Sequence, residues 1–261
     1  MKINVSLDRD TTFLFHLINL YSCNPTTVNV DYRKEYSHLR DPEFFSLFET
    51  LESPWIENYL LKKKFPEDIL LKEKEKFDSI WGTLKKESEK TVKILEKIKS
   101  TAERKLGEAV ELLNISPKFN EIRVFVVPGL KVHGMQGKDN EIFIGVKPLN
   151  EEEYQFLVFH ESMHVILRET FNKLYFSEGY REELQLIEET YINFLYHRMF
   201  HPSEKLLPCW LCLKNAKHYE IFTKLVGVYE HVRDPEKFVK NARNRVLRRE
   251  TRDSEHGSSG N

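Results

Sequence analysis

The stretch Glu151 to Leu167, EEEYQFLVFHESMHVIL, decides the fold around which this chain is arranged. Asn150 followed three residues later by Glu153 is the pattern of an N-cap and its reciprocal cap, so a helix is expected to begin near Glu151. Apolar side chains then recur at helical spacing and form one stripe: Phe156, Phe159, Met163 and Ile166. The sequence therefore predicts a long helix that packs on a core along this stripe.

Two histidines and a glutamate follow each other on this helix, in His160-Glu161-Ser162-Met163-His164. Residues four apart lie on one face of a helix, so His160 and His164 can bind one metal ion. The pattern His-Glu-x-x-His is typical of zinc enzymes whose glutamate is a general base on a zinc-activated water. The residues alone also permit two hydrogen-bonded core histidines beside a solvated glutamate. We expect Zn²⁺ as the cofactor and Glu161 as the base.

Two β-rich segments precede the helix. Ile122 to Val127 (IRVFVV) ends at a Pro-Gly turn signal, and Glu141 to Val146 (EIFIGV) follows a loop rich in residues that tolerate positive φ. The order of strand, glycine-containing loop, strand and His-Glu-x-x-His helix resembles a zincin metallopeptidase domain. The resemblance implies an α+β fold with a small sheet, whose last strand before the zinc helix is an edge that pairs with an extended substrate. That edge strand would consist of Ile142, Phe143, Ile144, Gly145 and Val146.

A catalytic zinc site needs a third protein ligand besides the two imidazoles. The residues after His164, VILRET, lack the glycine and third histidine of the metzincins, so the resemblance implies a glutamate on a second helix, as in the gluzincins. Residues 180–200, YREELQLIEETYINFLYHRMF, have helical periodicity and are expected to form that helix. They contain four glutamates: Glu182, Glu183, Glu188 and Glu189.

Two arguments disagree about which glutamate is the ligand. Helical projection places Glu188 in the middle of an apolar face, where a buried carboxylate would need a cation. The resemblance points instead to Glu189, because gluzincin glutamate helices carry Glu-x-x-x-Asp and Asn193 stands in the place of that Asp. We take Glu189 as the third ligand, keep Glu188 as the alternative, and expect Asn193 to orient a zinc-bound histidine.

These residues predict hydrolysis of peptide bonds, with a peptide or a small protein as the substrate. The tetrahedral intermediate would need a hydrogen-bond donor for its oxyanion, which gluzincins commonly take from a Tyr or His beyond the glutamate helix. The candidates are His197, His201, His218, Tyr219 and His231, with Tyr175, Tyr180 and His133 as further ones. The alternative function is that of a zincin-fold binding or regulatory protein that keeps the metal site but has no turnover.

Composition limits the partners. The 40 basic and 41 acidic residues give a formal net charge of −1, so no nucleic-acid partner is expected. The first ten residues mix charge into the region where a signal peptide would be apolar, and no apolar run approaches the length of a bilayer span. We therefore expect a cytoplasmic protein without membrane attachment. Cys209 and Cys212 lack a second cysteine pair and are interpreted as buried apolar residues rather than as half of a zinc site.

The chain is expected to have three regions. Residues 1–115 are predicted to be mainly helical, as scaffold or as a cover over the cleft. Residues 116–235 are predicted to form the zincin-like domain. Residues 236–261 are predicted to form a basic amphipathic helix and a disordered tail.

Within the first region the pattern predicts three kinds of element. A short strand-like start is followed by a dense apolar run and then by a Lys/Glu-rich stretch with apolar residues spaced by threes and fours. The expected elements are a strand over Ile3 to Leu7, a buried helix over Phe13 to Tyr21, and one or two long helices from Pro66 to Leu113 with a break at Gly82.

Overall fold

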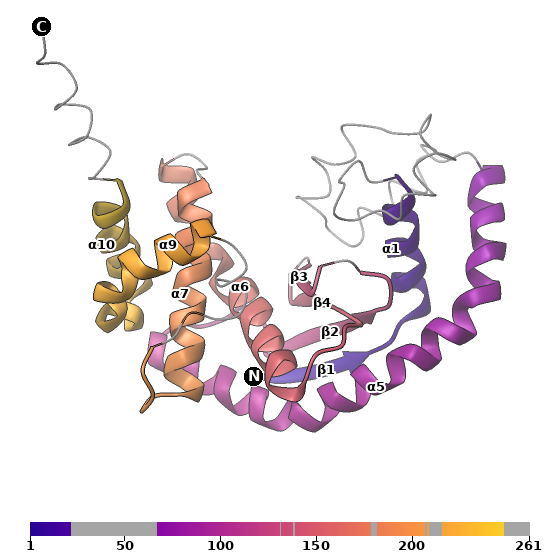
Figure 1. The fold of residues 1–261 in the computed structure, drawn as a ribbon, viewed down its shortest axis with the longest axis horizontal. Helices are drawn as coiled ribbons and strands as arrows, with labels where there is room; N and C mark the ends of the chain where they lie inside the picture. The colour runs from indigo at the N-terminus through magenta and orange to yellow at the C-terminus, as the bar shows by residue number, and fades with distance from the viewer. Residues whose placement is uncertain are drawn as a thin grey trace, which may run out of the picture. The chain divides into compact units, whose positions relative to one another are not determined.

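The computed structural model describes residues 1–21, 67–130, 132–137, 139–178, 182–206, 208 and 216–247. Over these residues the protein is a mixed α+β protein, mostly helical, with one small sheet (Figure 1). The chain divides into two compact units, Met1–Arg104 with Phe119–Val165 and Lys105–Lys118 with Ile166–Asn261. The predicted α+β class with a small sheet is confirmed.

In the described residues, all four strands lie before residue 146, together with two helices, and only helices are found after it. The elements are β1 (Lys2–Ser6), α1 (Arg9–Tyr21), α5 (Glu67–Leu113), β2 (Glu121–Val127), β3 (Gly134–Gln136), β4 (Glu141–Gly145), α6 (Glu151–Glu178), α7 (Glu182–Phe200), α9 (Ala216–Leu225), the 3₁₀ helix η2 (Val226–Arg233) and α10 (Pro235–Leu247).

The sheet lies in the first unit and has the strand order β1-β2-β4-β3. β1, β2 and β4 run parallel, whereas β3 pairs antiparallel with β4. The expectation that Ile142–Val146 forms the sheet edge is therefore wrong, because β4 is flanked by β2 and β3, and Val146 lies beyond its end. The described edge strand on this side is β3, whose three residues, Gly-Met-Gln, include no β-branched side chain that would have indicated a strand.

The N-terminal residues belong to this sheet. β1 pairs with β2 from Lys2 beside Glu121 to Ser6 beside Phe125, so the predicted start of a separate domain at residue 116 is wrong. The pairing joins residues more than a hundred positions apart, and a local sequence pattern carries no information on such contacts.

Both N-terminal helices are present: α1 begins at Arg9, before the predicted start at Phe13, and α5 matches its prediction with one exception. On α1, Phe13 packs against Phe77 of α5 at 5.1 Å between ring centroids, and Phe15 packs against Phe143 of β4 at 4.8 Å. The exception is that α5 continues through Gly82 without the predicted break. A glycine inside a helix costs only about 1 kcal/mol relative to alanine, which the packing of a helix this long can offset.

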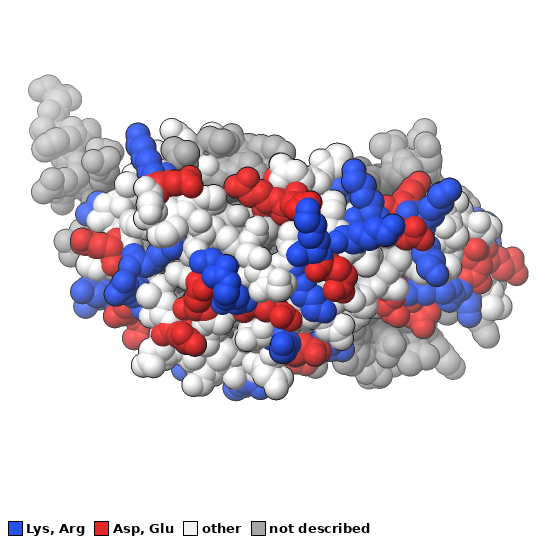
Figure 2. All heavy atoms as spheres, turned by 90° about the horizontal axis from the view of Figure 1, so that it is seen from below, with Lys and Arg blue, Asp and Glu red and all other residues white. Residues whose placement is uncertain are grey.

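Ion pairs accompany α5 along its exposed side. Figure 2 shows basic and acidic side chains interspersed over the face seen from below. Three of the pairs have the spacing of neighbouring helical turns: Lys76 with Glu73 at 2.8 Å, Lys99 with Glu96 at 3.5 Å and Lys105 with Glu108 at 2.9 Å. None of the helices in the described ranges has an apolar stretch long enough to cross a membrane.

Helix α6 begins where its predicted cap places it. The backbone N–H of Glu153 donates to Oδ1 of Asn150 at 2.9 Å, and the N–H of Asn150 donates to Oε2 of Glu153 at 2.8 Å. Both bonds of the reciprocal cap are therefore present, and they define the turn from the sheet into the helix.

Tyr154 connects the start of α6 to the rest of the first unit. Its fully buried hydroxyl donates to the carbonyl of Lys147 at 2.8 Å, accepts from the N–H of Lys147 at 3.1 Å, and lies 3.1 Å from Oγ1 of Thr91 on α5. Tyr154→Phe removes the hydroxyl that bonds to both Lys147 and Thr91. We therefore expect the free energy of unfolding to fall by about 1–3 kcal/mol in urea titrations. Tyr219→Phe, at a residue 47% exposed on α9, is the control and should change little. Equal effects of the two substitutions would contradict this role of the hydroxyl.

The second unit is built around α7. The hydroxyl of Tyr191 donates to the carbonyl of Val232 at 2.8 Å, and burial raises the pKa of this phenol far above its usual range. Rings from α9 and α10 meet Phe194, with Phe222 at 5.3 Å and Phe238 at 5.8 Å. The predicted basic C-terminal helix is confirmed over Pro235–Leu247, and its expected continuation, the tail and both cysteines of the Cys209 pair lie outside the described residues.

Candidate metal centre

Helix α6 brings two imidazole rings together. His160 and His164 are one turn apart, only 4% and 7% exposed, and their Nε2 atoms are 3.1 Å from each other. The ring of Phe156 packs on His160 from the preceding turn, at 5.2 Å between centroids. Both rings thus turn an Nε2 atom toward one point.

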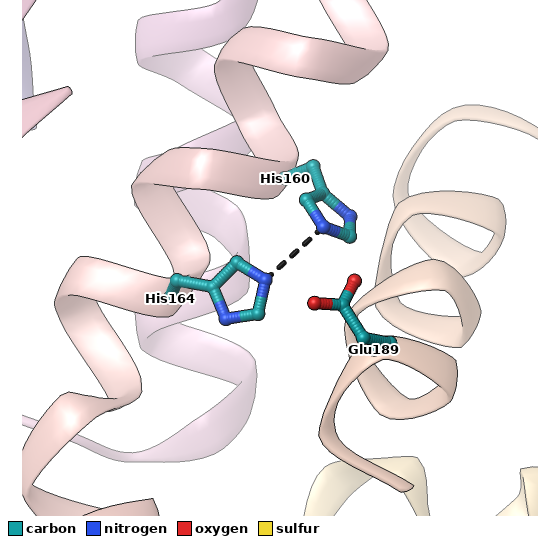
Figure 3. Close-up of side chains that lie close together, drawn as sticks. All are labelled: His160, His164 and Glu189. Carbon is teal, nitrogen blue, oxygen red and sulfur yellow. Dashed lines mark hydrogen bonds between the residues drawn. The ribbon is translucent and has the colours of Figure 1, made fainter. Parts of the chain in front are cut away.

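Glu189 of α7 supplies a carboxylate to the same point. One ligand atom from each of His160, His164 and Glu189 lies within 4.8 Å of the others. Figure 3 shows the carboxylate directed toward the two rings. Among the residues that the structure describes, this is the one group of three or more His, Cys, Asp or Glu side chains with such convergence.

The donor set and its spacing fit a zinc ion. Two imidazole nitrogens and one carboxylate oxygen form one of the ligand sets of catalytic zinc, which leaves a fourth position open. Tetrahedral zinc with bonds of about 2.0–2.1 Å separates two ligand nitrogens by roughly 3.3 Å. The 3.1 Å between the two Nε2 atoms is close to this value, and it is also the length of a hydrogen bond between two neutral imidazoles.

Glu188 and Asn193 lie on α7 on either side of Glu189 in sequence. Glu188 is 7% exposed, as helical projection predicted, but it is Glu189, half-buried, that belongs to the convergent group. Asn193 is 3% exposed and follows Glu189 by one helical turn. Its expected bond to a ligand histidine stays a prediction.

Glu161 lies next to the two histidines in sequence and against the edge strand in space. Its side chain is buried, with 8% of the residue exposed. A Cβ atom built on Gly134 of β3 would stand 2.9 Å from Cγ and 3.0 Å from Oε1 of Glu161. Sequence reasoning missed this neighbour, because the only local signal was a glycine beside His133.

His197, one of the expected oxyanion donors, is held on both of its ring nitrogens. Nε2 lies 3.1 Å from the carbonyl of Lys205, which can only accept, so Nε2 carries the proton. Nδ1, 3.2 Å from the hydroxyl of Tyr229, then accepts from that hydroxyl. The ring therefore joins α7 to the following turn and to η2.

The other four candidates also lie in the second unit. Nδ1 of His201 is 3.1 Å from Glu204, and Nε2 of His231 is 3.4 Å from Glu230. His218 is half-buried and Tyr219 exposed, both on α9. Choosing the oxyanion donor from among these candidates remains a matter of prediction.

Of the three further candidates for the oxyanion donor, only His133 has a described side chain. His133 is half-buried directly before β3, and its carbonyl accepts from the N–H of Gly145 at 2.9 Å. The side chains of Tyr175 and Tyr180 lie outside the described residues.

Burial of His197 predicts a pH dependence of stability. Burial lowers the pKa of this imidazole below its ordinary 6.5, against the opposing effect of its bond to the Lys205 carbonyl. The unfolded chain then binds more protons than the folded one, so this contribution is complete above pH 6.5 and is lost as the pH falls below it. His197→Gln should flatten the slope of unfolding free energy against pH below about pH 6.5 in urea titrations. Equal slopes for the wild type and His197→Gln would contradict this role of His197.

Comparison with known proteins adds no relative. The chain matches no protein-family model, no curated protein and no solved structure. The chemistry of the centre follows from its own donor set and surroundings.

Proposed function

We propose that this protein is a zinc-dependent peptidase of zincin type, with the ion held by His160, His164 and Glu189 and with Glu161 as general base. The observation that supports the proposal most is the convergence of two buried imidazoles and one carboxylate on a single point. The glutamate needed for proton transfer follows the first of these histidines on the same helix.

The residues divide the reaction between them. A Zn²⁺ ion held by His160, His164 and Glu189 would supply a Lewis acid that lowers the pKa of a bound water to about 7. Glu161 takes a proton from the water as its oxygen attacks the carbonyl carbon of the substrate. The same carboxyl group then gives the proton to the leaving amine as the C–N bond breaks.

The edge strand suggests how a substrate is bound. β3 has a neighbour on one side only among the described strands, so its other side can accept an extended peptide as a further strand. Gly134 of this strand is in contact with Glu161, so a peptide paired with β3 would run close to the base. We propose that β3, and not β4, takes the role of the substrate strand, and that the substrates are peptides or small proteins.

Metal analysis combined with a peptide assay tests the proposal. The purified protein should contain stoichiometric zinc and cleave members of a quenched fluorescent peptide library. A chelator should stop cleavage, and added zinc should restore it. Stoichiometric zinc without cleavage would support a binding or regulatory protein, and no zinc at all would support two hydrogen-bonded core histidines.

A further inference from the structure

Around the edge strand, three glycines lie where a side chain would meet a neighbour: Gly134 of β3, Gly137 directly after it, and Gly145 of the adjacent β4. At Gly137 a Cβ atom would meet Phe143 at 2.6 Å, and at Gly145 it would meet the main-chain oxygen of Val132 at 2.7 Å. At Gly134 it would meet three atoms of one side chain, that of Glu161: Cγ at 2.9 Å, Oε1 at 3.0 Å and Cδ at 3.2 Å. Real Cβ atoms essentially never approach another heavy atom closer than 3.0 Å. Residue 134 therefore has no room for a side chain while Glu161 holds its position.

The need for glycine at 134 is one of space and not of backbone conformation. Among the glycines that the structure describes, the one with positive φ is Gly129, at 84°. Gly134 has ordinary strand geometry and pairs with Ile144. Any L-residue could adopt its backbone, so what excludes a larger residue is the carboxylate-bearing side chain beside it.

The side chain that would have to move is that of Glu161, the general base of the proposed reaction, whose position relative to the water matters most. The Glu161 side chain can rotate, so a methyl group at 134 displaces it more readily than it displaces the main chain. A misplacement of about 1 Å at a reacting group can cost on the order of 10²-fold in rate. The position of the Glu161 carboxyl group thus depends on the absence of a side chain at residue 134.

We propose that Gly134 is a positioning residue for Glu161: its missing side chain lets the carboxyl group lie against the edge strand, beside the place where a substrate backbone would pair. The catalytic part of this inference rests on the proposed function. The steric part does not, because it concerns only two residues of this chain.

A double-mutant cycle on stability tests the steric part without any activity. G134A should lower the midpoint of thermal unfolding by about 2–4 °C or more. E161A removes Cγ, Cδ and Oε1, the three atoms in the way, so most of this loss should disappear when G134A is combined with E161A. Combination with E161Q, which keeps these atoms or their equivalents, should not relieve it.

Gly145 provides the matched control. The obstacle there is a main-chain oxygen of Val132, so G145A should lose the same stability with or without E161A. A loss for G134A that is equally large in the E161A background would overturn the proposal.

Kinetics on a peptide cleaved by the wild type tests the catalytic part. G134A should lower kcat by roughly 10–100-fold, with KM changed by less than about 2-fold because no group that would bind the peptide is removed. An unchanged kcat would overturn the positioning role. If the wild type cleaves no peptide, the proposed function fails, whereas the stability cycle still decides whether Gly134 makes room for Glu161.

Discussion

Glu161→Gln is expected to lower kcat for peptide hydrolysis by roughly 10²- to 10⁴-fold while leaving the zinc content unchanged. The amide has nearly the shape of the carboxylate and keeps its place beside Gly134, but it cannot accept the proton of the attacking water. Steady-state kinetics on a peptide found in the library screen, with zinc measured by mass spectrometry on the same samples, checks both parts.

Ser162→Ala is the matched control for this substitution. Ser162 is the next residue on α6 and fully buried, and its Oγ has no hydrogen-bond partner among the residues described. Removing this hydroxyl breaks no bond, so activity and stability should stay at the wild-type level. Full activity of Glu161→Gln would remove Glu161 from the mechanism, and loss of zinc in that variant would assign its effect to the metal site.

Glu189→Gln is expected to lower the affinity for zinc by roughly 10²- to 10³-fold. Zinc binding free energies of about 10–16 kcal/mol, shared among three or four ligands, give roughly 2.5–5 kcal/mol for each ligand. An amide oxygen lacks the charge of a carboxylate and recovers only part of this. Competition with a chromophoric chelator measures the change, and the rise in the unfolding midpoint on adding zinc should shrink in parallel.

Glu188→Gln separates the two glutamates. Glu188 is adjacent in sequence and more buried than Glu189, but it is not part of the convergent group, so its variant should keep the wild-type affinity for zinc. The opposite result, with Glu188→Gln weak and Glu189→Gln normal, would make Glu188 the ligand. If both variants bound zinc with the affinity of the wild type, neither glutamate would be a ligand.

The elements that the sequence predicted well depend on neighbours in the chain. The reciprocal cap of Asn150 and Glu153 involves residues three apart, and β2 and β4 are rich in β-branched and aromatic residues. Where local signals were weak or misleading, the prediction was wrong. β3 is three residues long with a glycine at its start, and Gly82 was expected to break a helix that continues through it.

The candidate site follows the same division. His160 and His164 share a face through the geometry of one helix, so their convergence was predictable from their spacing. The choice of Glu189 over Glu188 came from resemblance to the gluzincins, and helical projection alone favoured the other residue. The contact of Glu161 with Gly134 joins a helix to a strand, and no pattern within either segment indicates it.

The sequence by itself determined the helix that carries His160 and His164, its first residue and the approach of the two imidazoles, because hydrogen bonds and side-chain spacing within one helix set all three. Only the tertiary structure decided that β3 is the sheet edge, that β1 joins β2, and that Glu189 approaches the two rings. Those outcomes depend on which surfaces pack together across long stretches of chain, and the free energy of such packing belongs to the whole fold rather than to any one segment.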